Sequence, residues 1–250
     1  MTGFRNVLVG WAPDLGDPTT FVMLRHGETE HTRQRRFSGG RPDGGGPELN
    51  ELGRWQAAMA ADHLARLADD PGTHHAAHPP IDVVVASPMA RTVQTASIVA
   101  DRLGVGVETH AGFVECDFGA WEGLTLDEVR QRHPDDLDAW FASTEAPPTS
   151  GESFEAVQQR VRFARDDVLR SHRGSTVLVV THVTPTKSMV RLALDAPTTA
   201  LYRMELAPAS FTSVMWFADD VASLRFFNDT AHLRGRRGHG ATSHLEGDGT

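Results

Sequence analysis

The residues with the clearest capacity for chemistry are Arg25 and His26, which follow the apolar run at 21–24 and precede Gly27. A short apolar run of this kind predicts a buried strand. Ligands of open α/β sheets bind at the carboxyl edge of the strands, so this strand would hold a cation and an imidazole at a binding edge. Gly27 would let the backbone turn sharply and approach a ligand. The expected ligand is an anion, and histidine can form a covalent intermediate with it.

Three further polar groups could converge on this strand end. Arg91 lies in the first turn of a predicted helix, His182 directly follows an apolar strand, and Glu115 lies in a loop that could cover them. Two arginines and two histidines around one point repel each other unless an anion lies among them. Taken singly, Arg91 could be an ion-pair partner and His182 a backbone-bonded histidine. Glu115 could be a surface carboxylate, and Asp117 is a rival for its role.

Phosphoryl transfer suits this group of side chains. Arginine presents a rigid fork of donors that matches phosphate oxygens. Its charge also disfavours protonation of nearby histidines, which would leave one imidazole neutral and nucleophilic. The leaving oxygen needs a proton. Glu115 could supply it if burial in an apolar loop with Phe118 and Trp121 raises its pKa.

The elements that must position these residues alternate between apolar strands and amphipathic helices, which predicts an α/β fold with a mostly parallel sheet. Residues 210–217 and 222–228 should form an antiparallel hairpin that extends this sheet. The other predicted strands span about 20–25, 81–86, 106–108, 176–181 and 203–206, and the predicted helices about 51–69, 89–103, 126–132, 134–143, 152–172 and 185–194.

Local signals predict how several helices begin and which side chains they bury. Asn50 should cap helix 51–69, and a capping box at 125–128 should open helix 126–132. Residues 26–48 are expected to be a loop. The side chains expected to face inward are Leu52, Trp55, Ala58 or Met59, and Leu64 in the first helix, Trp140 and Phe141 in helix 134–143, and Phe154, Val157, Val161, Phe163 or Ala164, and Val168 in helix 152–172.

Length and composition set the remaining expectations. The 250 residues carry a formal charge of -9, which argues against nucleic-acid binding by the whole surface. The single cysteine excludes an internal disulfide and fits a cytoplasmic protein. The sequence contains no apolar run of about 18 residues, so no membrane span is expected. His74, His75 and His78 form a cluster without a carboxylate or cysteine, so no metal site is expected.

The motif at 24–29, Leu-Arg-His-Gly-Glu-Thr, resembles the signature of the histidine phosphatase superfamily, also called phosphoglycerate mutase-like. Further motifs follow in the family's order, at 36–39, 87–96, 115–123, 151–153 and 180–182. The resemblance covers about 20–228 and implies a three-layer α/β/α sandwich. We therefore expect an N-terminal arm at 1–19, a histidine phosphatase domain at 20–230 with a cap insert at about 112–152, and a mobile tail at 231–250.

The resemblance also implies roles for individual residues. His26 would be the nucleophile that becomes phosphorylated, and Glu115 would donate a proton to the leaving group and then activate water. Arg25, Arg91 and His182 would bind the transferred phosphoryl group. No metal or other cofactor is implied. The residues expected to bind substrate around this centre are Thr32, Arg36, Ser38, Gly39 and Val183.

Hydrolysis is the expected reaction, with phosphoglycerate mutase-type transfer as an alternative. Mutases of the family use a lysine shortly after the acid loop, and the segment 124–129 has none. Arg130 and Arg132 are expected to be solvated. The chain resembles the acid phosphatase half of actinobacterial bifunctional ribonuclease H/acid phosphatase proteins, and also α-ribazole phosphatases. Upstream of residue 20 there is no room for a ribonuclease domain, so only the phosphatase activity would carry over.

Two further expectations concern partners. The implied substrate is a small phosphorylated metabolite that the sequence does not specify. A non-catalytic binder of phosphorylated ligands is the alternative from another class, although such a binder need not keep His26, Arg91, Glu115 and His182 together. A homodimer, formed through the hairpin edge strand or an apolar helix face, is left open.

Overall fold

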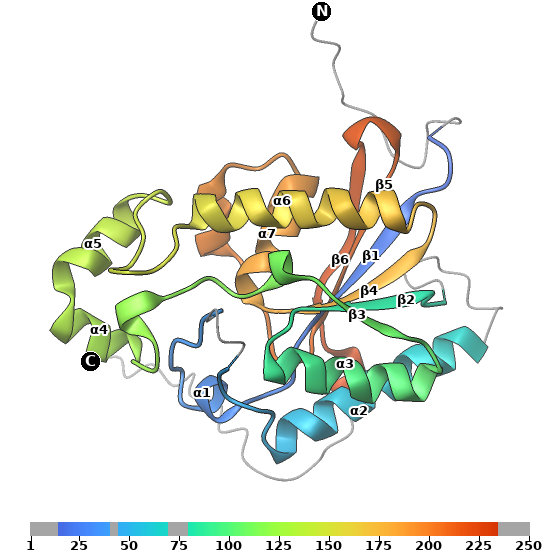
Figure 1. Ribbon diagram of the computed structural model, residues 1–250, viewed down its shortest axis with the longest axis horizontal. Helices are drawn as coiled ribbons and strands as arrows, with labels where there is room; N and C mark the ends of the chain where they lie inside the picture. Colours follow the sequence, from blue (N-terminus) through green and yellow to red (C-terminus); the bar gives the residue numbers. More distant parts are fainter. Residues whose placement is uncertain (1–14, 41–44, 70–79, 235–250) are drawn as a thin grey trace, which may run out of the picture.

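The computed structural model describes residues 15–40, 45–69 and 80–234, and its centre is a six-stranded sheet (Figure 1). The strands lie in the order β3-β2-β4-β1-β5-β6. Neighbours are parallel from β3 to β1, whereas β5 is antiparallel to both β1 and β6. The mostly parallel sheet and its antiparallel hairpin are therefore confirmed. The strands are β1 Thr19–Arg25, β2 Val83–Ala86, β3 Val107–Thr109, β4 Thr176–Thr181, β5 Phe211–Trp216 and β6 Ala222–Asp229.

Helices cover both faces of this sheet, so the fold is a three-layer α/β/α sandwich (Figure 1). Side chains of β1 point alternately to the two faces. Val22 and Leu24 pack with alanines of α2 and α3, whereas Phe21 and Met23 pack with valines of α6. The helices are α1 Glu30–Arg33, α2 Glu51–Asp69, α3 Ala90–Leu103, α4 Leu126–Arg132, α5 Pro134–Ala142, α6 Phe154–Ser171 and α7 Val183–Ala193.

Helices α4 and α5 form a cap at one end of the molecule, beside the start of α6 (Figure 1). The predicted capping box is confirmed: the Thr125 side chain accepts from the Glu128 N–H, and the Glu128 carboxylate accepts from the Thr125 N–H. The cap has a small core of its own, in which Trp121 packs with Val129 and Leu137. The cap can therefore form one wall of a pocket without contributing to the main sheet.

Helix α2 begins as predicted but buries a different face. Asn50 caps it by accepting a hydrogen bond from the Gly53 N–H at 2.8 Å. The inward positions are mostly alanines, including Ala57, Ala60 and Ala61, together with Leu64. The expected Trp55 is only partly buried, as are Leu52, Ala58 and Met59. Small side chains allow close approach to α3, which the spacing of the large apolar residues did not indicate.

Several other expectations are corrected. Residues 203–206 form no strand: a 3-10 helix, η4 (Thr198–Arg203), ends there. Helix α7 begins two residues earlier than predicted, at Val183. The loop at 26–48 contains the short helix α1. Phe141, expected to face inward, is 52% exposed; of the alternatives Phe163 and Ala164, the structure buries Ala164 and leaves Phe163 68% exposed. An aromatic ring followed by another apolar residue leaves the helical phase ambiguous, and packing resolves it.

The remaining expectations fall largely outside the described residues. Residues 1–14 of the proposed arm, the histidines at 74, 75 and 78 and residues 235–250 of the tail lie there. Residues 231–233 form a 3-10 helix, η6, that contacts α2. Within the described ranges, no helix has the length and apolar character needed to cross a membrane. The division into arm, domain and tail, the cytoplasmic location and the homodimer stay predictions.

Candidate active site

The two histidines singled out in the sequence lie together at the carboxyl edge of the sheet. His26 follows β1 and His182 follows β4, and these strands are parallel neighbours. Their ring centroids are 5.2 Å apart, with an angle of 63° between the ring planes. His26 is 5% exposed and His182 is fully buried. The convergence expected from the strand ends is therefore found.

A backbone contact fixes the protonation pattern of the His26 ring. Its Nδ1 atom lies 2.7 Å from the carbonyl oxygen of Gly27. A carbonyl oxygen can only accept, so Nδ1 must carry the proton. In the neutral ring the other nitrogen, Nε2, then holds a free electron pair. Gly27 is tightly packed, because a Cβ there would lie 2.3 Å from the carbonyl oxygen of Gly53 in α2.

Both histidines are held in the neutral form. Burial lowers the pKa of His26 well below its usual value of 6.5, and the charges of Arg91 and Arg25 lower it further. Burial likewise lowers the pKa of His182, with smaller contributions from Arg91 and His26. A neutral imidazole is the form that can attack phosphorus. The expectation that arginines would suppress protonation is thus correct, although burial is the larger cause.

These pKa shifts predict how stability depends on pH in the absence of a bound anion. Below pH 6.5 an unfolded chain takes up protons on both histidines before the folded chain does. The unfolding free energy should therefore fall as pH is lowered from 6.5, by at most about 1.4 kcal/mol per pH unit for each histidine. The unfolding free energy, measured with urea between pH 7.5 and 5, should decline less steeply in a His26→Gln/His182→Gln double variant than in the natural chain. Equal slopes would contradict the shifts.

A hydroxyl group orients His182. Its Nε2 lies 2.8 Å from the Ser87 hydroxyl, at the end of β2. The Ser87 carbonyl in turn accepts from the Thr92 hydroxyl of α3 at 2.7 Å. The Nδ1 atom of His182 is buried and has no hydrogen-bond partner among the residues that the structure describes. One nitrogen is therefore anchored, and the other is left without a partner from the described residues.

Two arginines, Arg91, which is buried, and Arg25, which is partly buried, supply positive charge beside the histidines. Arg91 is 1% exposed, and its Nη2 donates to the carbonyl oxygens of Ser38 and Gly39 at 3.2 Å each. Its Nε and Nη1 have no acceptor within the described ranges. Burial lowers the pKa of Arg91 and lowers that of Arg25 to about 10, while Glu115 opposes both changes. Buried cations with unused donors favour an anionic ligand.

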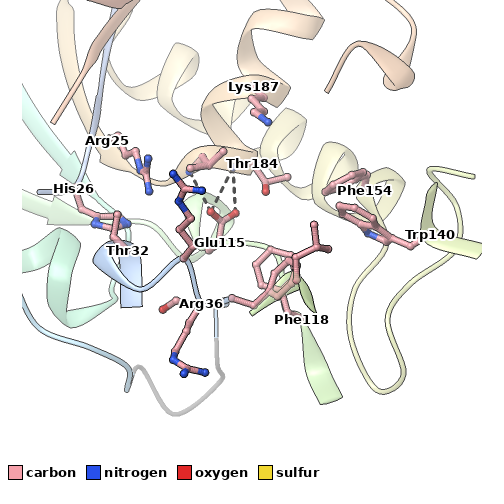
Figure 2. Close-up of a pocket in the computed structure, with 15 residues that line it drawn as sticks. Arg25, His26, Thr32, Arg36, Glu115, Phe118, Trp140, Phe154, Thr184 and Lys187 are labelled. Carbon is pink, nitrogen blue, oxygen red and sulfur yellow. Dashed lines mark hydrogen bonds between the residues drawn. The ribbon is translucent and has the colours of Figure 1, made fainter. Parts of the chain in front are cut away.

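Glu115 has surroundings different from those expected. The predicted environment was an apolar loop, but the carboxylate faces the N-terminus of α7 (Figure 2). Its oxygens accept from the N–H groups of Cys116 at 2.8 Å and of Val183 and Thr184 at 3.1 Å. Backbone donors at a helix N-terminus stabilise negative charge. This contact was missed because the sequence analysis began α7 two residues too late.

Asp117, the sequence rival of Glu115, has a structural role. Its carboxylate accepts from the Gly119 N–H at 2.9 Å and so holds the turn that opens the 3-10 helix η3 (Gly119–Trp121). It does not line the pocket that contains His26 and Glu115. Glu115 is therefore the carboxylate that the structure brings to the histidine pair.

Arg160 of α6 holds the segment that carries Glu115, and the sequence analysis did not single it out. Its guanidinium donates to the carbonyl oxygens of Gly112, Val114 and Glu115 at 2.7–3.0 Å. It also forms an ion pair with Glu152 at 2.8 Å. One side chain thus ties three residues of the loop to the helix behind it. Only its position near the motif at 151–153 could have indicated this role.

Replacing Arg160 with glutamine is expected to impair catalysis through the position of Glu115. Displacement of a reacting group by about 1 Å can cost roughly a hundredfold in rate. We expect kcat for phosphate release to fall by about tenfold to a hundredfold on this basis. Arg162→Gln, on the exposed side of the same helix, is the matched control. Steady-state kinetics with both variants would test this, and equal kcat values would contradict it.

A pocket of about 420 Å³ opens from these residues toward the cap. Of the ten site residues predicted from the sequence, seven line it, whereas Arg91, His182 and Gly39 do not. Lys187 and Arg35 also line it and were not predicted as site residues. The lining residues are Arg25, His26, Thr32, Arg35, Arg36, Phe37, Ser38, Glu115, Phe118, Leu126, Trp140, Phe154, Val183, Thr184 and Lys187.

The predicted substrate residues differ in how free they are to bind a ligand. Arg36 pairs with Glu128 of α4 at 2.8 Å and points away from Glu115 in Figure 2. Gly39 is buried; its N–H donates to Glu122 and its carbonyl accepts from Arg91. Their most direct structural role is to hold the loop 36–39 against the cap and the arginine. The Thr32 hydroxyl, at 3.1 Å from that of Thr29, lines the pocket.

The fold and this arrangement define a known class of protein. The model for the histidine phosphatase superfamily, branch 1, matches residues 21–230. The chain belongs to this superfamily. By class it is a histidine phosphatase with the phosphoglycerate mutase-like fold that the sequence motifs indicated.

Individual relatives agree with this assignment. The bifunctional protein Rv2228c of Mycobacterium tuberculosis is 43% identical over 224 residues, which cover 90% of this chain and 57% of that protein. The chain therefore spans little more than half the length of that relative. An acid phosphatase of Mycobacterium tuberculosis is 30% identical over 84% of this chain and 93% of its own length.

A solved structure supports the same fold. The mycobacterial glucosyl-3-phosphoglycerate phosphatase Rv2419c, in complex with VO3, matches with a TM-score of 0.71 at 26% identity. The match covers 84% of this chain and 99% of that one. The layers and the sheet described above are therefore those of a solved phosphatase structure.

Proposed function

We propose that the protein is a phosphomonoester hydrolase that acts on a small phosphorylated metabolite through a phosphohistidine on His26. The observation that carries this proposal is the state of His26. Its Nδ1 proton is committed to the Gly27 carbonyl, and its pKa is held well below 6.5. The free electron pair of Nε2 is thus available in a site with the buried Arg91 and the partly buried Arg25, which would bind the transferred phosphoryl oxygens.

The reaction would proceed in two displacements. Nε2 of His26 attacks phosphorus, and the bond to the leaving oxygen breaks. An ester bound as a monoanion brings one proton into the site, which Glu115 can hold and pass to that oxygen. The neutral alcohol leaves. Glu115, again ionised, then removes a proton from water as the water attacks the phosphohistidine and releases phosphate.

Hydrolysis is favoured over a mutase reaction by the cap. A mutase would need cations there to hold the carboxylate of its substrate. The segment 124–129 carries no lysine. As expected, Arg130 is exposed and pairs with Asp127, and Arg132 is exposed too. The relatives with phosphatase names support the same choice.

The test of the proposed function is phosphate release from p-nitrophenyl phosphate at mildly acidic pH, with and without EDTA. We expect turnover that EDTA does not reduce, because the described residues contain no group of three metal-ligating side chains. A non-catalytic binder of phosphorylated ligands would bind the ester without turnover. Equal rates for the natural chain and a His26→Ala variant would favour that binder.

A further inference from the structure

The pocket changes character along its length. His26 and Arg25 lie at one end, Glu115 and Thr184 lie in the middle, and Phe154 and Trp140 form the other end (Figure 2). The phosphoryl group would occupy the first end, so the second end would receive the alcohol part of the ester. The apolar side chains among the lining residues of the whole pocket are Phe37, Phe118, Leu126, Trp140 and Phe154.

The aromatic wall is built before any ligand arrives. The Trp140 ring contacts the rings of Trp121, Phe154 and Tyr202, with centroids 5.0–5.6 Å apart. The Tyr202 hydroxyl donates to the Trp140 carbonyl oxygen at 2.5 Å. A wall fixed in this way loses little conformational freedom when a flat apolar group packs on it. Its shape and composition favour a ring over a short polar chain.

Lys187 places one positive charge beside this wall. It lies on α7 one turn after Val183 and Thr184, whose N–H groups bind Glu115. Residues three and four positions apart share a helix face, and the Cα atom of Lys187 lies about 5 Å along the axis from those of Val183 and Thr184. In Figure 2 the Lys187 ammonium lies near Thr184, on the side of the pocket opposite Phe118.

The charge of Lys187 is not balanced by an ion pair. Its Nζ donates to the Leu201 carbonyl at 3.0 Å. The carboxylates whose charges act on it are Glu115 and Glu205, and neither forms an ion pair with it in the described part of the chain. Burial lowers the pKa of this ammonium, because desolvation disfavours its charged form. Glu115 lies nearby, but backbone N–H groups already bind its oxygens. The ammonium has two further N–H groups that could donate hydrogen bonds to a ligand.

The other charged residues that line the pocket do not neutralise Lys187. Arg36 is neutralised by Glu128, and Arg25 belongs to the phosphoryl end. Arg35 is an exposed cation at the mouth. Glu115 is the single carboxylate among the lining residues that the structure describes. The end that would receive the alcohol is therefore apolar on one side and cationic on the other.

We propose that the substrate is the phosphate ester of an alcohol that carries a ring and an anionic substituent, with the ring against Trp140 and Phe154 and the anion paired with Lys187. This inference rests on the hydrolase function proposed above and specifies its substrate class. It makes Lys187 a specificity-determining residue for the reaction.

Four esters of primary alcohols test this proposal, because their leaving groups are chemically similar. They are propyl phosphate, benzyl phosphate, 4-carboxybenzyl phosphate and 4-carbamoylbenzyl phosphate. The measured quantity is kcat/KM for phosphate release. We expect benzyl phosphate to exceed propyl phosphate by about tenfold, since a buried ring gains roughly 1.5 kcal/mol or more. We expect the carboxylate to exceed its neutral amide by about tenfold as well, which corresponds to 1.4 kcal/mol.

Variants of Lys187 then assign the charge preference. In Lys187→Gln the ratio of carboxylate to amide should fall to about one, and Lys187→Arg should keep most of it. Ratios within one variant cancel any general effect of the substitution on Glu115 or on folding yield. Arg130→Gln, an exposed cation of the cap that pairs with Asp127, should leave both ratios as they are in the natural chain.

The outcomes distinguish failure of this inference from failure of the proposed hydrolase function on which it rests. Hydrolysis that depends on His26 but shows no ring or carboxylate preference would overturn the substrate class alone. A carboxylate preference that survives in Lys187→Gln would overturn the role of Lys187. A further outcome is that the natural chain hydrolyses none of the four esters faster than the His26→Ala variant does. In that case the proposed hydrolase function fails, and this inference fails with it. The comparison of esters in the natural chain needs no variant to fold.

Discussion

Replacing His26 with alanine is expected to lower kcat for p-nitrophenyl phosphate by roughly a thousandfold or more, because the attacking nitrogen is removed. His26 is the neutral imidazole at the end of β1 whose Nε2 is free. Acid-labile, alkali-stable labelling of the protein by the ester, which reports phosphohistidine, should also disappear. Kinetics and quenched labelling measure the two effects separately.

His172→Ala is the matched control for this variant. His172 follows α6, lies 3.4 Å from the Glu108 carboxylate and does not line the pocket. It should retain both turnover and labelling. Labelling that persists in His26→Ala would show that another residue is the nucleophile.

Replacing Glu115 with glutamine is expected to have the second largest effect, and its size should depend on the leaving group. General acid catalysis contributes roughly a hundredfold to ten-thousandfold, so an alkyl phosphate such as benzyl phosphate should be hydrolysed slower by about that factor. p-Nitrophenolate leaves without a proton, so its release in the first turnover should be affected far less. Water attack still needs a base, so a burst of p-nitrophenolate followed by slow turnover is expected.

Asp117→Asn provides the control for Glu115. Asp117 is two residues away and holds the turn at Gly119 rather than facing His26. Its substitution should show no burst and no dependence on the leaving group. Stopped-flow absorbance and steady-state kinetics would distinguish the variants. A burst in Asp117→Asn but not in Glu115→Gln would reverse the two roles.

The positions of the charged groups at the strand ends could be predicted from the sequence. Apolar runs that end in Arg25-His26 and in His182 define two strands, and parallel strands bring their carboxyl ends to one edge. Most helices could be placed for similar reasons, because Asn50, Thr125 and Ser153 cap three of them with their side chains. These signals are local, so one sequence suffices to read them.

Contacts between distant segments could not be predicted. The inward face of α2 is set by how closely it approaches α3, which favours alanines over the larger Trp55. The environment of Glu115 depends on where α7 begins, and residues Val183 and Thr184 precede the proline that seemed to mark the start. Neither Lys187 nor Arg160 was predicted as a site residue. Their importance follows from what they face across the pocket and the loop.

Among the residues that the structure describes, Glu115 is the single carboxylate that lines the pocket of His26, and this has a stereochemical consequence. If Glu115 serves both the departing alcohol and the incoming water, the two must use the same side of phosphorus, opposite the imidazole. Each displacement inverts the phosphorus centre, so two successive inversions restore its original handedness. Consider an ester whose phosphorus is made chiral with oxygen isotopes and sulfur. Its phosphoryl group should therefore be transferred to an acceptor alcohol with the configuration at phosphorus retained.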